Sequence, residues 1–104
     1  MWYNMAMKIL IDADGCPVVD LTLQAAAEHG LEAILFCDTS HEFKEKNARV
    51  VTVDKGSDSA DFALIRQVKP GDIVVTQDYG LAAMVLAKRG YPITQNGKRL
   101  TDAN

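Results

Sequence analysis

Residues 9–17 read Ile-Leu-Ile-Asp-Ala-Asp-Gly-Cys-Pro, and this stretch decides how the rest of the chain is interpreted. The apolar run leading into it has no helical period and stops at two carboxylates and a glycine, which predicts a buried strand ending in an acidic turn. Pro17 suits the first position of a helix, because its φ is already helical and its missing N–H would have no partner there. Asp12 and Asp14 therefore lie where a strand passes into a helix, at the rim where open α/β sheets bind ligands.

The composition predicts a single domain over residues 1–104, with residues 1–6 as a short arm. With 48% apolar and 24% charged residues, a chain of 104 residues can build one core and is too short for two. No apolar run approaches the roughly 20 residues that span a bilayer, and no signal-peptide pattern is present. We therefore expect a cytoplasmic protein without membrane contact.

The net charge and the numbers of histidines and cysteines argue against two kinds of binding: broad electrostatic capture of nucleic acid and zinc binding. A net charge of -3 argues against broad electrostatic capture of nucleic acid, which needs a basic surface. Bound metal ions could still offset a local acidic cluster, so a nucleic-acid enzyme is not excluded. With two histidines and no cysteine pair at ligand spacing, the sequence does not predict a zinc site.

The remainder of the chain alternates predicted strands and helices. After the strand that ends near Ile11, we expect strands over Leu31–Cys37, Arg49–Val53 and Ile73–Thr76, then Tyr91–Thr94 ahead of a hairpin or terminal turn at Asn96-Gly97. Helices are expected over Val18–His29, Ser59–Val68 and Leu81–Arg89, the first ended by Gly30 and the last by Gly90. This alternation predicts a three-layer α/β fold: a mostly parallel β-sheet of four or five strands with helices on both faces.

The first predicted helix also has a predicted buried face. Its apolar residues are spaced so that one side of the helix would pack on the sheet. That side carries Val18, Leu21, Ala25 and Ala26.

Aspartates gather at the predicted ends of the strands. Ten of the 14 acidic residues are Asp. Four of them follow strands (Asp12, Asp38, Asp54 and Asp78), and three lie in adjoining loops or the first turn of a helix (Asp14, Asp58 and Asp61). Since parallel strands end at one edge, these carboxylates would repel each other unless cations bind or protons are shared. Mg²⁺ or Mn²⁺, which prefer oxygen ligands, are the expected occupants. Asp72 falls outside the pattern, at the other end of its strand.

A structural interpretation competes with this one. Asp14, Asp58 and Asp78 each stand where an N-cap residue is expected, and Asp is among the preferred N-caps. Capping requires only one acid per helix and does not explain Asp12, which precedes the turn.

Several motifs resemble the YaiI/YqxD family of small bacterial proteins, which is grouped with PIN-like nuclease folds. The resemblance is carried by Ile-Asp-Ala-Asp-Gly-Cys-Pro-Val at 11–18, Gly-Ser-Asp-Ser-Ala-Asp at 56–61, Pro-Gly-Asp-Ile-Val-Val-Thr-Gln-Asp at 70–78, and Asn-Gly followed by Leu-Thr near the end. Family members commonly carry alanine or another small residue at the position of Gly15, and usually continue beyond that of Asn104 with a polar extension.

The resemblance implies a PIN-like site in which metal-bound carboxylates orient a water for attack on a phosphodiester. Its catalytic residues would be Asp12, Asp61 and Asp78, with Asp14 and Asp58 as further metal ligands. The implied function is Mg²⁺- or Mn²⁺-dependent cleavage of single-stranded RNA in preference to DNA. We further expect Lys55, Ser57 and Thr76 to bind the substrate. The oligomeric state is left open.

Two other functions fit the same residues. Asp-Ala-Asp-Gly after an apolar strand is similar to the nucleophile loop of haloacid dehalogenase-type phosphohydrolases, with Asp12 attacking phosphorus and Asp14 as general acid. Thr39 or Ser40 would then supply the phosphate-binding hydroxyl. The third possibility is a non-catalytic module whose acidic rim binds a metal, a nucleotide or a partner protein.

Overall fold

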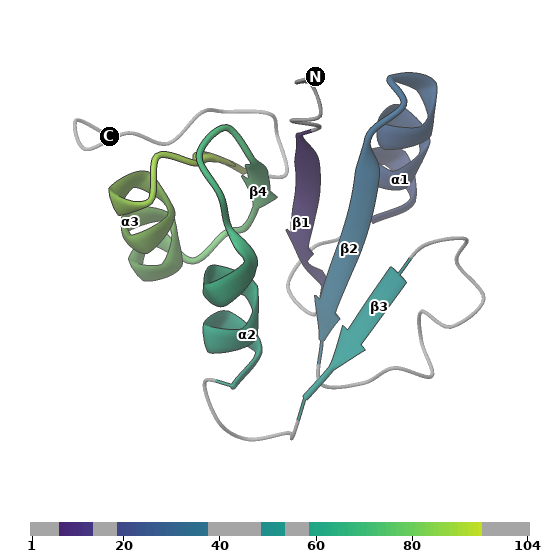
Figure 1. Cartoon of the computed structure of the whole chain (residues 1–104). Helices are drawn as coiled ribbons and strands as arrows, with labels where there is room; N and C mark the ends of the chain where they lie inside the picture. Colours follow the sequence, from purple (N-terminus) through teal and green to yellow (C-terminus); the bar gives the residue numbers. More distant parts are fainter. Residues whose placement is uncertain (1–6, 14–18, 38–48, 54–58, 95–104) are drawn as a thin grey trace.

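The computed structural model describes residues 7–13, 19–37, 49–53 and 59–94 (Figure 1). In chain order, its elements are β1 Lys8–Asp12, α1 Val19–Glu28, β2 Glu32–Cys37, β3 Arg49–Thr52, α2 Ser59–Gln67, β4 Ile73–Val75, α3 Tyr79–Ala87 and β5 Tyr91–Ile93. The predicted α/β class is confirmed, and each strand or helix expected within these ranges is present.

The five strands form one parallel sheet in the order β3-β2-β1-β4-β5. In Figure 1 the arrowheads of β1, β2 and β3 point to the same lower edge, where the strands end. β1 lies at the centre and pairs with β2 on one side and β4 on the other. From β1 the chain first builds β2 and β3 on one side, and it then crosses back to build β4 and β5 on the other side of β1. This makes the carboxyl ends of β1 and β4 a topological switch point, where open α/β sheets bind ligands.

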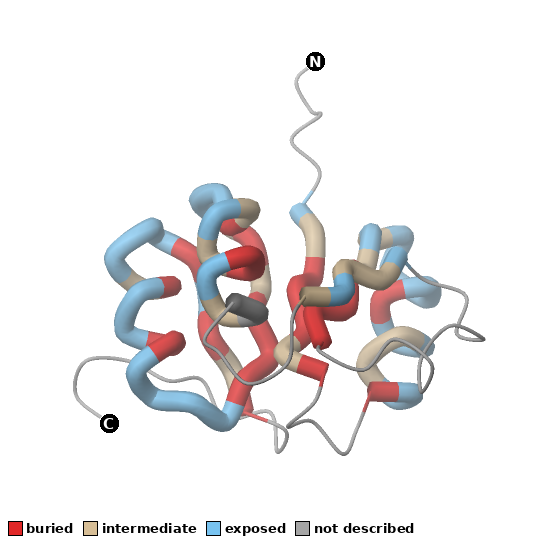
Figure 2. The backbone as a smooth tube through the Cα atoms, turned by 90° about the horizontal axis from the view of Figure 1, so that it is seen from below, coloured by how far each residue is buried: buried red, intermediate tan, exposed pale blue. Residues whose placement is uncertain are grey.

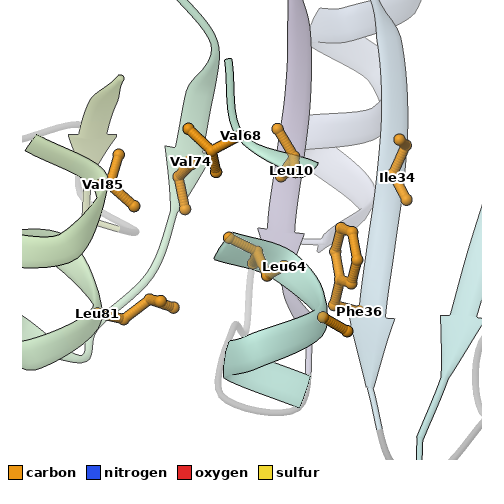
Figure 3. Close-up of a cluster of buried hydrophobic side chains, with 9 residues drawn as sticks. Leu10, Ile34, Phe36, Leu64, Val68, Val74, Leu81 and Val85 are labelled. Carbon is orange, nitrogen blue, oxygen red and sulfur yellow. The ribbon is translucent and has the colours of Figure 1, made fainter. Parts of the chain in front are cut away.

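Two hydrophobic clusters cover the two faces of the sheet. Alternate residues of β1 separate them, since Ile9 and Ile11 belong to the cluster under α1 while Leu10 belongs to the cluster under α2 and α3. In Figure 3, Leu64 of α2 lies over Leu10 and Phe36. Burying side chains of this size stabilises the fold by about 1.5–3 kcal/mol each. The buried residues concentrate in the strands and on the inner sides of the helices (Figure 2), so the predicted three layers are confirmed.

The predicted buried face of α1 is wrong in part. Val19 and Ala26 are buried, and Leu23 packs against the same cluster, whereas Leu21 is 66% exposed and Ala25 is exposed. Residues 19, 23 and 26 share one side of a helix by the i, i+4, i+7 rule. Small and apolar residues occur on both adjacent stripes of this helix, so spacing alone did not distinguish them. Val18 lies outside the described residues.

The predicted limits of α3 are also corrected. The helix begins at Tyr79, two residues before the expected start, because Asp78 caps it. It ends at Ala87, and Arg89, not Gly90, takes the left-handed conformation with a φ of 66°. Gly30, by contrast, has a φ of 68° after α1, as expected for a glycine that ends a helix.

Asp72 is part of the scaffold at the amino edge of the sheet. It is 3% exposed and forms an ion pair with Lys8 of β1. Its carboxylate also accepts hydrogen bonds from the backbone N–H of Lys69 (2.9 Å) and of Lys8 (3.2 Å). These contacts join the start of β1 to the turn before β4.

Three expectations of the sequence cannot be placed. The arm at 1–6, the Asn96-Gly97 turn and the strand-end residues Asp38 and Asp54 lie outside the described residues. Within the described ranges, every helix is too short or too polar to cross a membrane.

Candidate active site at the carboxyl edge

Asp12 and Thr76 are neighbours at the switch point. Ile11 of β1 pairs with Val75 of β4, so the residues that follow them emerge side by side. The Thr76 hydroxyl Oγ1 donates a hydrogen bond of 3.1 Å to Oδ2 of Asp12. This hydrogen bond fixes one side of the Asp12 carboxylate, and no hydrogen bond from a described residue reaches the other oxygen, Oδ1.

The same hydroxyl also contacts Asp78. Oγ1 of Thr76 accepts a hydrogen bond of 3.0 Å from the backbone N–H of Asp78. The Thr76 backbone N–H in turn donates to the carbonyl of Ile93 in β5, at 3.0 Å. Thr76 thus connects the ends of three adjacent strands to the start of α3.

The prediction that Thr76 binds substrate needs correction. The residue is 1% exposed, and its hydroxyl is engaged by Asp12 and Asp78. A buried, doubly bonded hydroxyl is not placed to contact a substrate. Its evident role is to position the two acids.

Asp78 is the N-cap of α3, as the structural interpretation expected. Its Oδ1 accepts hydrogen bonds from the backbone N–H groups of Gly80 (2.8 Å) and Leu81 (3.2 Å). These are donors that a helix start leaves unpaired. Asp78 is nevertheless exposed, and its Oδ2 takes no hydrogen bond from the described residues. Capping therefore occupies only one of its two carboxylate oxygens.

The two acids influence each other electrostatically. Partial burial raises the pKa of Asp12 above the usual value for aspartate, the hydrogen bond from Thr76 lowers it, and the negative charge of Asp78 raises it further. The net effect is a raised pKa, whose largest cause is that burial disfavours the charged form of Asp12. A bound cation would favour that charged form.

Asp61 lines a pocket together with Asp78. Asp61 lies half-buried in the first turn of α2, and the pocket has a volume of about 310 Å³. The remaining lining residues are Phe62, Gly80, Leu81 and Met84. Asp78 is therefore linked to Asp12 through the Thr76 hydroxyl and also lines a pocket with Asp61.

The predicted metal ligands are only partly placed. Within the described part of the chain, no three His, Cys, Asp or Glu side chains stand close enough together to hold a metal ion. Asp14 and Asp58 lie outside the described residues, as do Lys55 and Ser57 of the predicted substrate contacts and Thr39 and Ser40 of the phosphatase alternative. The oxygen donors of Asp12 and Asp78 fit a hydrated Mg²⁺, which keeps several waters and usually takes one or two protein carboxylates.

The sequence analysis did not single out Phe62 and Met84. Phe62 is 57% exposed although it is a large apolar residue of a helix. The sequence feature that could have indicated a role at the site was its position next to Asp61 in the first half of α2. The apolar pattern of the helix alone would predict that such a residue is buried in the core.

Comparison of the sequence with known proteins identifies the family of this chain. The model of the family described as "Uncharacterized BCR, YaiI/YqxD family" matches residues 10–104. The chain belongs to this family. It is 54% identical over 98 residues to a UPF0178 protein of Exiguobacterium sibiricum, and 49% identical over 98 residues to a UPF0178 protein of Lachnoclostridium phytofermentans.

The family members are longer than the region matched. The alignments cover 94% of this chain but 67% and 66% of those two relatives, so the chain spans about two thirds of their length. No solved structure matches the chain significantly. The YaiI/YqxD resemblance is thereby confirmed, whereas the PIN-like detail of the fold stays a prediction.

Proposed function

We propose that this YaiI/YqxD family member is a Mg²⁺- or Mn²⁺-dependent nuclease that cleaves single-stranded RNA in preference to DNA. One observation carries the proposal: a single buried hydroxyl, that of Thr76, holds Asp12 and Asp78 together at the topological switch point. Open parallel sheets bind ligands at this place. We also propose that the protein acts in the cytoplasm, because a chain of this kind with two cysteines is expected to keep them as thiols in a reducing compartment.

The chain's own residues would prepare the site for a phosphodiester. Thr76 fixes Oδ2 of Asp12, and the start of α3 fixes Oδ1 of Asp78. Sites held by such supporting hydrogen bonds need little reorganisation when a ligand arrives. Asp61 lines the same pocket as Asp78.

The donor set determines which cofactor fits. A bound Mg²⁺ or Mn²⁺ supplies an activated water and offsets the charge of the phosphodiester. Asp12 and Asp78 would hold it, since both offer hard oxygen ligands and Mg²⁺ usually takes one or two protein carboxylates, and Asp61 would act on the waters that the ion keeps. Without such a cation, the acids at this edge would repel the phosphate backbone of a substrate.

A cleavage assay tests the proposal. The protein is incubated with single-stranded RNA, single-stranded DNA and a small phosphomonoester, each with Mn²⁺, Mg²⁺ or EDTA. We expect Mn²⁺- or Mg²⁺-dependent cleavage of RNA. Asp12→Asn and Asp61→Asn should each reduce it by about a hundredfold or more, because each disturbs the bound cation that would stabilise the negative charge of the transition state.

The control is Glu28→Gln, which removes an exposed carboxylate at the last residue of α1, at the opposite edge of the sheet. This variant should cleave like the parent protein. Turnover of the phosphomonoester with a phosphorylated Asp12 would instead support the phosphatase alternative. Binding of Mn²⁺ or RNA without any turnover would support a non-catalytic module.

A further inference from the structure

The pocket shared by Asp61 and Asp78 has lining residues of two chemical kinds. Phe62 of α2 and Leu81 and Met84 of α3 are apolar, and Asp61 and Asp78 are acidic. The two carboxylates can only accept hydrogen bonds when both acids are ionised. A matching ligand therefore presents a flat or apolar body together with hydrogen-bond donors.

Large apolar side chains are exposed on α2 and α3, the two helices that supply lining residues to this pocket. Phe62 is 57% exposed and Met84 is 39% exposed, and Tyr79, which follows the shared Asp78, is 59% exposed. Half of the six large exposed hydrophobic residues among the described ranges lie on these two helices. A partly apolar surface rimmed by polar groups is the usual mark of a binding site.

Charge decides which part of a nucleic acid could occupy the pocket. Among the described residues that line it, the charged ones are the acids Asp61 and Asp78, and none is a Lys or Arg. A phosphate would be repelled there. A nucleobase fits better, because its face can stack on an aromatic ring and its amino groups can donate to carboxylates.

We propose that this pocket is a base-binding subsite that takes one unpaired nucleobase carrying an exocyclic amino group. The proposal rests on the function proposed above, because it places the base beside the phosphodiester that Asp12 and Asp78 would address. Cytosine should bind better than uracil, since uracil has a carbonyl where cytosine has its amino group. A volume of about 310 Å³ suits one small planar group, being at the low end for ligand pockets.

The pocket also implies single-stranded substrates. A base inside a duplex is already stacked on its neighbours and paired on its donor edge, so it cannot offer both to the protein. An unpaired base can lie on Phe62 and reach Asp61, its neighbour in the first half of α2.

Binding of short fluorescent oligocytidylate and oligouridylate, measured by anisotropy at constant salt with Ca²⁺ in place of Mg²⁺ or Mn²⁺, tests the subsite apart from cleavage, because Ca²⁺ binds oxygen ligands and offsets the charge of the acids. Phe62→Ala should weaken oligocytidylate binding by roughly fivefold or more, the lower end of what one stacked base contributes. Phe62→Tyr should restore it. Tyr91→Ala is the matched control, because Tyr91 is an aromatic residue, 42% exposed, at the start of β5 on the opposite edge.

Asp61→Asn provides an independent readout. Asn can donate as well as accept hydrogen bonds, so this variant should narrow the preference for oligocytidylate over oligouridylate. Circular dichroism checks that each variant is folded. Phe62 lies outside the two core clusters, so its replacement should leave the fold intact.

The outcomes separate the subsite from the nuclease. RNA cleavage that does not depend on Phe62 would overturn the subsite and leave the proposed function standing. Phe62-dependent oligocytidylate binding without any cleavage would support the subsite and overturn the proposed nuclease activity. Equal affinity for the two oligonucleotides would overturn the base preference. Phe62-dependent binding of an arginine-rich peptide alone would assign the pocket to a basic protein segment and overturn the proposal.

Discussion

At the scale of single residues, the Thr76 hydroxyl links two acids that would otherwise repel each other. It donates to Asp12 and accepts from the backbone of Asp78, and no water replaces either partner easily at 1% exposure. Thr76→Val keeps the shape of the side chain but removes both hydrogen bonds. We expect it to lower the free energy of unfolding by about 1–3 kcal/mol, the usual cost of leaving buried polar groups unpaired.

Urea denaturation measures this loss, and Thr76→Ser is the control because it keeps the hydroxyl. NMR titration adds a specific readout. The hydrogen bond from Thr76 lowers the pKa of Asp12, so that pKa should rise further in Thr76→Val and stay near the parent value in Thr76→Ser. A valine variant as stable as the parent, with an unchanged Asp12 pKa, would mean that the hydroxyl does not position the acids.

Asp12 should also make stability depend on pH. Burial and the charge of Asp78 raise its pKa in the folded protein above the unfolded value of about 3.9. Between these two pKa values, the folded state binds more protons than the unfolded state, so stability falls as pH rises. Asp12→Asn removes this pH-dependent loss of stability. Without metal, the free energy of unfolding of Asp12→Asn should exceed that of the parent by the largest amount near neutral pH, and this difference should shrink as pH falls through the raised pKa.

Urea melts in EDTA across a pH series measure that difference. Glu28→Gln reports the general effect of removing one negative charge at an exposed position. A stability difference between Asp12→Asn and the parent that is constant with pH would show that Asp12 is not shifted in the native state.

At the scale of secondary-structure elements, the strands were predicted better than the helix surfaces. Buried parallel strands are short apolar runs whose ends are marked by Asp, Gly or Pro, so β1 and β4 were located to within a residue. The buried face of α1 was not predicted correctly, because apolar residues such as Val19 and Leu21 lie on neighbouring stripes of the helix and either stripe could have packed against the core. Only the position of the helix over the sheet decides between them.

Gly90 gives the clearest test of packing between elements. It was predicted to end α3 by its conformational freedom, but the structure shows a close approach instead. A Cβ at this position would lie 2.7 Å from Cγ1 of Val85 and 3.2 Å from Cγ1 of Val68. Since Val85 is fully buried, we expect Gly90→Ala to cost about 1–3 kcal/mol of stability through overpacking.

Gly30 is the matched comparison. It has a φ of 68° and open space where its Cβ would lie, so Gly30→Ala should cost about 1–2 kcal/mol through backbone strain alone. Adding Val85→Ala should therefore relieve the penalty of Gly90→Ala but not that of Gly30→Ala. Chemical denaturation of the single and double variants measures this coupling. Equal, additive effects at both glycines would contradict the packing explanation.

At the scale of the whole molecule, part of the site follows from topology. Parallel strands end at one edge, so the sequence could predict that Asp12 and Asp78 would lie near each other. It could not predict that Thr76 would be buried between them, because that depends on the pairing of β1 with β4, far apart in the chain. The exposure of Phe62 likewise depends on how α2 sits beside α3.

Metal binding at the carboxyl edge should stabilise the whole fold. A cation that binds only the native state adds RT ln(1 + [L]/Kd), about 2.7 kcal/mol at roughly a hundredfold excess over Kd. We expect Mn²⁺ to raise the melting temperature of the parent protein, and Asp12→Asn and Asp78→Asn to lose most of that increase. Both variants should keep or raise the metal-free melting temperature, since each removes like-charge repulsion and Asn caps a helix almost as well as Asp.

Thermal melts with EDTA and with Mn²⁺ compare these variants with Glu28→Gln. Asp72 is unsuitable as a control despite its distance from the site, because it is buried and ion-paired with Lys8, so its replacement would destabilise the fold directly. Glu28 is exposed and should be replaceable without loss of the Mn²⁺-induced increase. An equal increase in all four proteins would place the bound metal away from Asp12 and Asp78 and remove the basis for a metal-dependent reaction at this edge.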